Sequence, residues 1–250
     1  MASDFLYVYP YSFHEAQRLN ELPLWKESHK ENVACKNAIE ETIRNGFDGM
    51  HLDKGCAERV ISDFGYHRVS YVLSNSLQQK DYDGRFSRGN HDWAKQTYIP
   101  PDKDAYSDRN AYFAVDSHPA VLDGFVNQYR RAYQSLGLFD YTHCLPDTEK
   151  QDFIGKVVVI SPKILRESCL TQQSQLWLCT GGFGSRAGSR GQSVFATCLA
   201  DGERTRWSRN DIVGVLADSH LPDWAQEKLV ELQQGRESSP QWDTEEDFEL

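Results

Sequence analysis

Hydrophobic residues near the start of the chain recur with the period of an amphipathic helix. Trp25, Val33, Ala34, Ala38, Ile39 and Ile43 fall at spacings compatible with one helix face, and Asn-Gly follows at 45–46. Side chains at this spacing share one face of an α-helix, so the pattern predicts a long helix that ends at the glycine. A short helix is expected before it, because Ser12 and Glu15 have the spacing of a helix-capping pair.

More helices are expected further along, with irregular segments between them. Apolar residues continue at helical spacing from 55 to 77, and Gly65 divides them into two predicted helices. The polar stretch 98–117 contains paired prolines, which cannot continue a helix, and is interpreted as a connector. A further helix is predicted from Pro119 to Leu136. At the start of the chain, residues 5–9 have the pattern of a strand.

From Lys156 the pattern changes from helical to alternating. The segments VVVIS, QLWLCT and SVFATCL are rich in β-branched residues or alternate apolar with polar ones, and glycine-containing turns separate them. Such segments are typical of strands. Near the end, Pro222 is a favourable first residue for the helix PDWAQEKLVELQQ, which Gly235 is expected to end.

These patterns predict an α+β fold, with a helical N-terminal unit followed by a small, mainly β C-terminal unit with a closing helix. The predicted organisation is a mainly helical domain at 1–100, a connector with one helix at 101–155, a small β-rich domain at 156–234 and an acidic disordered tail at 235–250.

Composition narrows the class of protein. Hydrophobic residues make up 39% of the chain and aromatic residues 12%, which is enough for a folded core. We expect a cytoplasmic protein outside the membrane, because the sequence has neither a long apolar run nor an export signal. The six cysteines are scattered and are interpreted as reduced thiols.

The net charge of −10 is concentrated at the C-terminus, where residues 237–250 include six acidic residues and no Lys or Arg. The rest of the chain is only mildly acidic. A protein that grips duplex DNA usually has a basic face, so the overall balance argues against general nucleic-acid binding. A local basic patch stays compatible with this balance.

The densest group of chemically capable residues lies in 65–94, GYHRVSYVLSNSLQQKDYDGRFSRGNHDWA. Its Asn90-His91 pair lacks the other blocks of a binuclear metallophosphoesterase, and Asp81-x-Asp83 lacks the later ligands of a calcium loop. We therefore expect no metal ion and interpret the segment as a turn network, with Asp83-Gly84 forming a tight turn that pairs Arg85 with a carboxylate. The residues predicted to form a recognition surface here are His67, Arg68, Asp81, Asp83, Arg85, Asn90 and Trp93.

A second candidate surface lies around LWLCTGGFGSRAGSRG. Gly182-x-Gly184-x-x-Ala187 fits a relaxed dinucleotide fingerprint, but the segment after it is strand-like rather than helical, which favours a glycine-rich hairpin without a cofactor. If Phe183 tops this hairpin, its ring is exposed and can stack on a base or anchor a protein interface. Nearby arginines fit either a solvated loop or a surface for phosphate or acidic groups. The candidates are Gly181, Gly182, Phe183, Arg186, Arg190, Arg206, Arg209 and Asp211.

Longer segments of the chain resemble a known group. GYHRVSYVLSNSLQQKDYDGRFSRGNHDWA, QLWLCTGGFG, SVFATCLADGERTRWSRNDIVGVL and LPDWA are similar to uncharacterised domains of conjugative-element and phage proteins from Clostridia-type bacteria, often parts of large polyvalent proteins. The resemblance covers about residues 5–100 and 156–230. It implies a counter-defence role, such as inhibition of a CRISPR or restriction nuclease, and it brings no catalytic residues.

The leading hypothesis is therefore a non-enzymatic protein that binds a host defence protein or ribonucleoprotein. Its carboxylates would occupy a cationic nucleic-acid groove, and such binding should weaken as salt rises. One alternative is a DNA-binding accessory protein that uses the arginine-rich C-terminal loop. Another is an enzyme directed at phosphoesters, for which the sequence supplies no catalytic residue.

Overall fold

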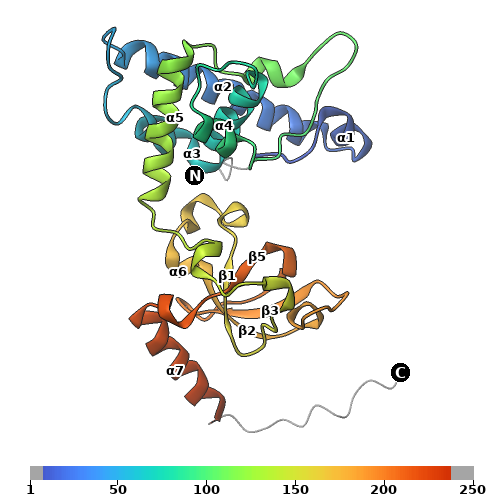
Figure 1. Cartoon of the computed structure of the whole chain (residues 1–250). Helices are drawn as coiled ribbons and strands as arrows, with labels where there is room; N and C mark the ends of the chain where they lie inside the picture. The colour runs from blue at the N-terminus through green and yellow to red at the C-terminus, as the bar shows by residue number, and fades with distance from the viewer. Residues whose placement is uncertain (1–7, 238–250) are drawn as a thin grey trace. The chain divides into compact units, whose positions relative to one another are not determined.

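The computed structural model describes residues 8–237, with side chains of the last helix described to Leu232. The chain divides into two compact units, unit 1 (Met1–Leu136) and unit 2 (Gly137–Leu250). Helices make up the regular structure of the first unit, and a five-stranded sheet with a closing helix forms most of the second (Figure 1). The predicted α+β class is confirmed.

Unit 1 contains five α-helices. They are α1 (Phe13–Arg18), α2 (Leu22–Gly46), α3 (Cys56–Gln79), α4 (Arg88–Ala94) and α5 (Pro119–Gln134). Both α2 and α5 carry a proline in their first turn, where no N–H is needed for the helix. The predicted connector helix is α5, and it packs within unit 1.

Local sequence signals explain where these helices begin and bend. The Ser12 hydroxyl accepts a hydrogen bond from the Glu15 N–H at 3.3 Å, which confirms the predicted cap of α1. Gly65 interrupts α3 with φ +77° and ψ 164°, a conformation that only glycine adopts readily. The predicted break is therefore a kink inside one helix.

The core of unit 1 lies around α3, which packs against α2 and α5 (Figure 1). Val69, Leu73 and Leu77 of α3 are completely buried, as are Ile39 of α2 and Phe125 of α5. Residues 72–77 of α3 are all buried, including Ser74, Asn75 and Ser76. A helix surrounded in this way can bury polar residues only when each finds a hydrogen-bond partner.

Unit 2 is built on an antiparallel sheet with strand order β4-β3-β2-β1-β5. Its strands are β1 (Val157–Ile160), β2 (Leu176–Gly181), β3 (Ser193–Cys198), β4 (Arg204–Ser208) and β5 (Ile212–Val215). All four residues of β1, an interior strand between β2 and β5, are buried. A short helix, α6 (Gln172–Gln175), precedes β2, and α7 (Asp223–Glu237) follows the sheet.

The register of the strands determines which residues share a face. Leu178 of β2 lies opposite Thr197 of β3, so these two and Leu199 point to the same side of the sheet. Leu178 and Leu199 join a core cluster with Ala225 of α7, which places that helix against this side. Phe195 belongs to the same side and is 49% exposed, so it lies beyond the covered part.

Several elements differ from their predictions. Strands β4 and β5 were not predicted, and α4 occupies a segment interpreted as a turn network. The closing helix continues through Gly235 to Glu237, since a single glycine weakens a helix without ending it. The predicted strand at 5–9 falls largely outside the described residues, and 8–10 form no regular structure; most of the predicted acidic tail, from 238 onward, also lies outside them.

Candidate functional site

The cluster in 65–94 contains two buried members that connect helices. Arg68 of α3 is 1% exposed, and its guanidinium donates to the Ser28 carbonyl at 3.0 Å and to Asn32 Oδ1 at 2.5 Å. Both partners lie on α2. A buried charge is tolerated only with such hydrogen bonds, so Arg68 fastens α3 to α2 rather than facing a partner.

Asn90 has the same role between α4 and α5. Its side chain is fully buried, donates to Asp123 Oδ1 at 2.8 Å and to Asn127 Oδ1 at 3.1 Å, and accepts from Arg130 at 2.6 Å. The prediction that this residue lies on a recognition surface is corrected by these contacts. Trp93 is partly buried, with its ring 5.6 Å from that of Tyr129, and His67 is half-buried on α3.

The other charged members of the cluster lie on the surface and pair with one another. Arg85 donates two hydrogen bonds to Asp83, at 2.9 and 2.7 Å, which confirms the predicted turn and lowers the pKa of Asp83 to about 2. Asp81 lies 3.0 Å from the Lys95 ammonium and 3.6 Å from the His91 ring. Exposed pairs of this kind contribute little to stability.

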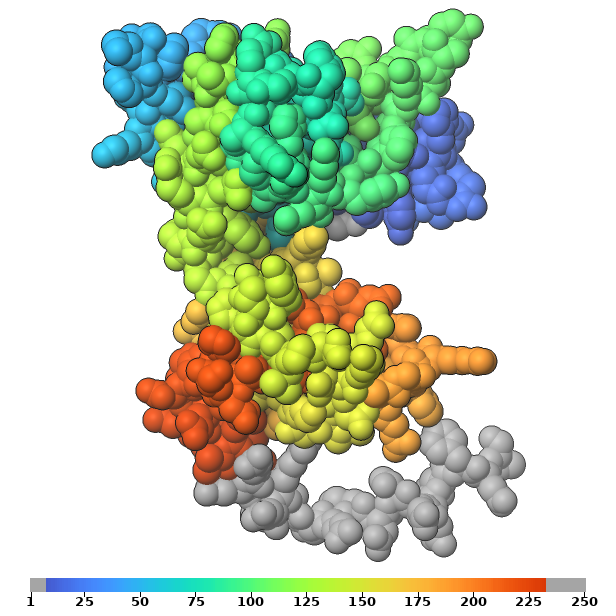
Figure 2. Space-filling model, viewed as in Figure 1, coloured from blue at the N-terminus to red at the C-terminus, as the bar shows by residue number. Residues whose placement is uncertain are grey.

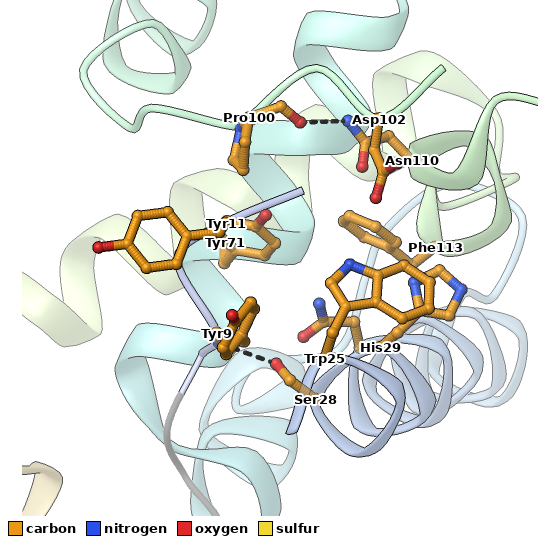
Figure 3. A pocket seen from close by; sticks show the side chains of 11 residues that line it. Tyr9, Tyr11, Trp25, Ser28, His29, Tyr71, Pro100, Asp102, Asn110 and Phe113 are labelled. Carbon is orange, nitrogen blue, oxygen red and sulfur yellow. Dashed lines mark hydrogen bonds between the residues drawn. The ribbon is translucent and has the colours of Figure 1, made fainter. Parts of the chain in front are cut away.

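A small pocket in unit 1 is lined by residues from the segment before α1, from α2 and α3, and from the segment after α4 (Figure 3). Its lining residues are Tyr9, Tyr11, Trp25, Ser28, His29, Asn32, Tyr71, Pro100, Asp102, Asn110 and Phe113. The cavity volume of about 20 Å³ is room for a water molecule, not for a substrate.

The ionisable groups of this pocket are held by the fold. The Asp102 carboxylate accepts from the Phe13 N–H at 2.8 Å and from Arg109 at 3.3 Å. His29 stacks on Trp25 with ring centroids 4.6 Å apart, and burial lowers the pKa of His29. Burial also raises the pKa of Tyr71, so its hydroxyl stays protonated. The pocket is therefore a packed aromatic junction.

Next to this junction, residues 98–112 form a projecting segment that we call the tyrosine loop. Figure 2 shows it in green at the edge of unit 1. Tyr106 is 98% exposed, and Tyr98 and Tyr112 are also exposed. The backbone is fixed nonetheless: Asp104 Oδ1 accepts from the N–H groups of Tyr106 and Ser107 at 2.8 and 2.9 Å.

Buried contacts fasten the base of the tyrosine loop. Arg109 bridges Asp102 and Asp104, at 3.3 and 2.7 Å, and its guanidinium lies 4.3 Å from the centre of the Phe13 ring. Asn110 donates to the Pro100 carbonyl at 2.9 Å. An exposed aromatic ring on a fixed backbone loses little entropy on binding, which suits a protein interface.

In unit 2, residues 181–191 form the glycine loop between β2 and β3. Gly182 has φ +100°, and a Cβ there would lie 2.4 Å from the Ser193 carbonyl oxygen. A Cβ on Gly191 would lie 2.4 Å from Phe183 Cβ. These glycines let the loop pack closely on the start of β3. Because β2 and β3 pair antiparallel, the hairpin interpretation is confirmed and the dinucleotide fingerprint is wrong.

Arg209 holds this loop through hydrogen bonds to backbone carbonyls. Its guanidinium donates to the carbonyls of Gly184, Thr148 and Gln151, at 2.5, 3.0 and 2.9 Å, and stacks 4.0 Å above the Phe153 ring. Asp211 accepts from the Ser208 N–H at 3.1 Å and caps a turn. Arg209 and Asp211, both predicted as binding residues, are thus used by the fold.

The remaining candidates of unit 2 are exposed. Phe183 is 82% exposed at the top of the glycine loop, as its position between glycines predicts. Arg186 and Arg190 are exposed in the same loop, and Arg206 is exposed on β4. Gly181 ends β2 beside them. The structure therefore brings together the predicted residues of the glycine loop and leaves those of 65–94 in the other unit.

Two further observations concern the described residues as a whole. Between residues 8 and 237, no three or more His, Cys, Asp or Glu side chains are grouped so that they could hold a metal ion. Over the same range, no helix combines the length and apolar character needed to cross a membrane.

A family model described as a protein of unknown function, DUF3849, matches residues 8–134. The match starts just before α1 and ends with the last residue of α5, so it covers the helices of unit 1 and about half of the chain. The chain belongs to the DUF3849 family. No curated protein and no solved structure matched the chain.

The DUF3849 match includes one of the two exposed aromatic loops and not the other. The tyrosine loop and the aromatic junction lie inside the matched residues, whereas the glycine loop lies outside them. Sequence reasoning missed the tyrosine loop because its prolines indicated only a connector. Three tyrosines within 98–112, with aspartates at turn positions, were the signal that could have identified it.

Proposed function

We propose that this chain is a non-enzymatic counter-defence protein of a mobile element or phage. It acts in the cytoplasm by binding a host defence nuclease of the CRISPR or restriction type, or that nuclease's nucleic-acid complex. The resemblance to clostridial conjugative-element and phage proteins supports the biological setting. The tyrosine loop supports binding as the activity.

Tyr106 is the observation that carries this proposal. Its ring is 98% exposed at the tip of a loop whose backbone is held by Asp104. Tyrosine supplies a large contact area with few rotatable bonds, and it is enriched among the residues that dominate binding energy. A monomer gains no stability from such a ring, so its presentation favours a role in contact with a partner.

The charged residues of the tyrosine loop indicate the charge expected on the partner's surface. Asp104 and Asp108 accompany the tyrosines, and Arg109, one of the two basic residues of the loop, is already paired with Asp102 and Asp104. With three aspartates against Lys103 and Arg109, the tyrosine loop has a net charge of −1, a sign that suits a cationic groove of the kind that holds nucleic acid. Competitive binding there requires no catalytic residue on this chain.

The test is capture from a clostridial host lysate with the full chain as bait, combined with a plasmid-protection assay in the same host. We expect recovery of a nuclease or ribonucleoprotein, weaker recovery as salt rises, and better survival of a targeted plasmid. Tyr106→Ala should reduce affinity for the captured partner by roughly tenfold or more.

Tyr82→Ala is the matched control, because Tyr82 is an equally large ring that is 89% exposed in the same unit outside the loop. It should leave capture and protection unchanged. The proposal fails if no nuclease or ribonucleoprotein is recovered and the plasmid is not protected. It also fails if Tyr82→Ala and Tyr106→Ala have the same effect.

A further inference from the structure

Unit 2 has a second exposed surface, separate from the tyrosine loop and outside the DUF3849 match. Phe195 of β3 lies directly opposite Arg206 of β4, so their side chains are neighbours on one face of the sheet. The next pair along, Thr197 and Arg204, places Arg204 on the same face. We call the exposed residues of this sheet face and of the adjoining glycine loop together the aromatic–arginine face: Phe183, Arg186, Arg190, Phe195, Arg204 and Arg206.

The backbone around Phe195 keeps its ring open. On the β2 side its partner is Gly181, which has no side chain to cover it. Gly182 approaches the backbone of β3 so closely that a Cβ would clash with the Ser193 carbonyl oxygen at 2.4 Å and lie 3.1 Å from the Phe195 nitrogen. Phe183 directly follows Gly182 in the chain. The close packing of Gly182 on β3 therefore holds the loop that carries Phe183 next to the strand that carries Phe195.

The arginines of this face are available for a ligand. Within the described residues, Arg186, Arg190, Arg204 and Arg206 form no ion pair or side-chain hydrogen bond. Asp201 and Glu203 lie at the β3–β4 turn, beside Arg204 and at the opposite end of β3 from the glycine loop. At the glycine loop itself, the Asp152 carboxylate is occupied by the Ala187 N–H, from which it accepts a hydrogen bond at 2.7 Å. Arg85 and Arg109 of unit 1, in contrast, are both paired with aspartates.

Two exposed rings among unpaired guanidinium groups match the chemistry of one ligand class. Bases of a single strand offer flat faces that stack on aromatic rings, and its phosphates pair with arginine. A duplex hides those faces between stacked base pairs, so it could use the arginines but not the rings. An acidic peptide would also meet the charges, yet it would leave stacking unused.

We propose that the aromatic–arginine face binds single-stranded nucleic acid. Bases stack on Phe183 and Phe195, while Arg186, Arg190, Arg204 and Arg206 contact the phosphates. Arg209 acts only through the loop that it holds. This proposal restricts the DNA-binding hypothesis for the arginine-rich loop to a single-stranded ligand. It is independent of the proposal that unit 1 binds a protein.

The experiment uses the full chain and a fluorescent 20-nucleotide oligodeoxythymidine, with binding followed by anisotropy across a salt series. We expect saturable binding at low salt, weaker binding to a duplex of the same length, and an affinity that falls as salt rises. Phe183→Ala and Phe195→Ala should each weaken binding by roughly tenfold. Arg206→Ala should reduce the dependence of log affinity on log salt by about 0.7.

Controls separate recognition from folding. Phe183→Trp keeps a stacking surface and should retain the affinity, and Arg85→Ala removes a paired arginine of unit 1 and should have no effect. Tyr106→Ala should leave oligonucleotide binding intact, so failure of this proposal is distinguishable from failure of the counter-defence proposal. The inference is overturned if the oligonucleotide does not bind at low salt, if the duplex binds as tightly, or if Phe183→Ala binds as well as the parent.

Discussion

The tyrosine loop of unit 1 and the glycine loop of unit 2 present exposed aromatic rings by different means. In the tyrosine loop, carboxylates of the loop itself hold the backbone: Asp104 accepts two N–H groups and pairs with Arg109. In the glycine loop, an arginine from outside, Arg209, holds the backbone through its carbonyls. A charged group that pairs within the fold is not available to a binding partner. Each loop can therefore offer a partner only the charged groups that stay unpaired.

The charged groups that remain unpaired differ between the two loops. In the tyrosine loop, Arg109 is paired with aspartates. The exposed rings of this loop are tyrosines, which can both pack and form hydrogen bonds. In the glycine loop, Arg186 and Arg190 stay unpaired among the described residues, and the exposed ring is the purely apolar Phe183. The first loop suits a protein surface and the second a polyanion with flat bases.

The largest effect is expected from Arg209→Met. Several carbonyls would lose their donor and Phe153 its stacked cation, which should lower the free energy of unfolding of unit 2 by about 2–3 kcal/mol. Chemical denaturation with hydrogen exchange of the β2 and β3 amides measures this. Arg206→Met, which removes an exposed arginine, should change stability by no more than about 0.5 kcal/mol. Equal effects of the two would mean that Arg209 does not hold the loop.

Gly182→Ala should be the next most damaging change. Alanine would have to adopt φ +100° and would place its Cβ against the Ser193 carbonyl, at a cost of about 2 kcal/mol. Gly188→Ala is the control, because φ is +67° there and no atom lies within 4 Å of the added Cβ; its cost should be about 1 kcal/mol. Thermal unfolding of both variants gives the comparison. If Gly188→Ala were the more harmful, close packing of the loop on β3 would not be what requires glycine.

Arg109→Met tests the holding charge of the tyrosine loop. Buried Asp102 would lose the Arg109 guanidinium and keep the Phe13 N–H, and we expect the free energy of unfolding of unit 1 to fall by about 1–2 kcal/mol. Faster hydrogen exchange at residues 104–110 should accompany it. Lys103→Met, an exposed neighbour, serves as the control. Unchanged exchange in that segment would contradict the assigned role.

A smaller effect is expected from pH in unit 1. Burial lowers the pKa of His29 from its usual value of 6.5, so the folded state favours the neutral ring and the unfolded state binds the proton more tightly. Stability should therefore fall as pH drops below 6.5 and level off below the lowered pKa. His29→Phe keeps the stacking on Trp25 and should flatten this part of the curve, measured as denaturation midpoints between pH 7.5 and 5. If His29→Phe has the same dependence of the denaturation midpoint on pH as the wild type, protonation of His29 does not cause the loss of stability.

The smallest effects on stability belong to the two presented rings. Tyr106→Ala and Phe183→Ala remove side chains that are almost entirely in water, so each should change the free energy of unfolding by no more than about 0.5 kcal/mol. Thermal denaturation checks both. A large loss in either variant would mean that its ring supports the fold, and the corresponding binding experiment could not be interpreted as loss of contact.

The sequence predicted the features that depend on near neighbours. Helical spacing, the Ser12 cap and the Gly65 break were sufficient for α1 to α3, and Asp83-Gly84 for the Arg85 turn. Strand β5 was missed because it pairs with β1, more than 50 positions earlier, and Gly214 interrupts its β-type pattern. Strand β4 was missed because its charged edge does not resemble a core strand.

The roles of individual arginines could not be predicted for a similar reason. Arg68 finds its partners 36 and 40 positions away, and Arg209 finds carbonyls as far as 61 positions away. Only the folded chain brings these groups together. Sequence reasoning therefore raised an exposed Phe183 only as a condition of its place at the top of a hairpin. It treated Arg206 and Arg209 alike, although one faces solvent and the other supports the loop.

The position of β4 at the edge of the sheet has a consequence for solubility. An edge strand exposes a row of backbone N–H and C=O groups that can pair with another copy of the chain. Arg204 and Arg206 place two like charges on that edge, and two such strands brought side by side would repel each other. The arginines that we assign to a polyanion thus also keep the sheet from growing by addition of further strands.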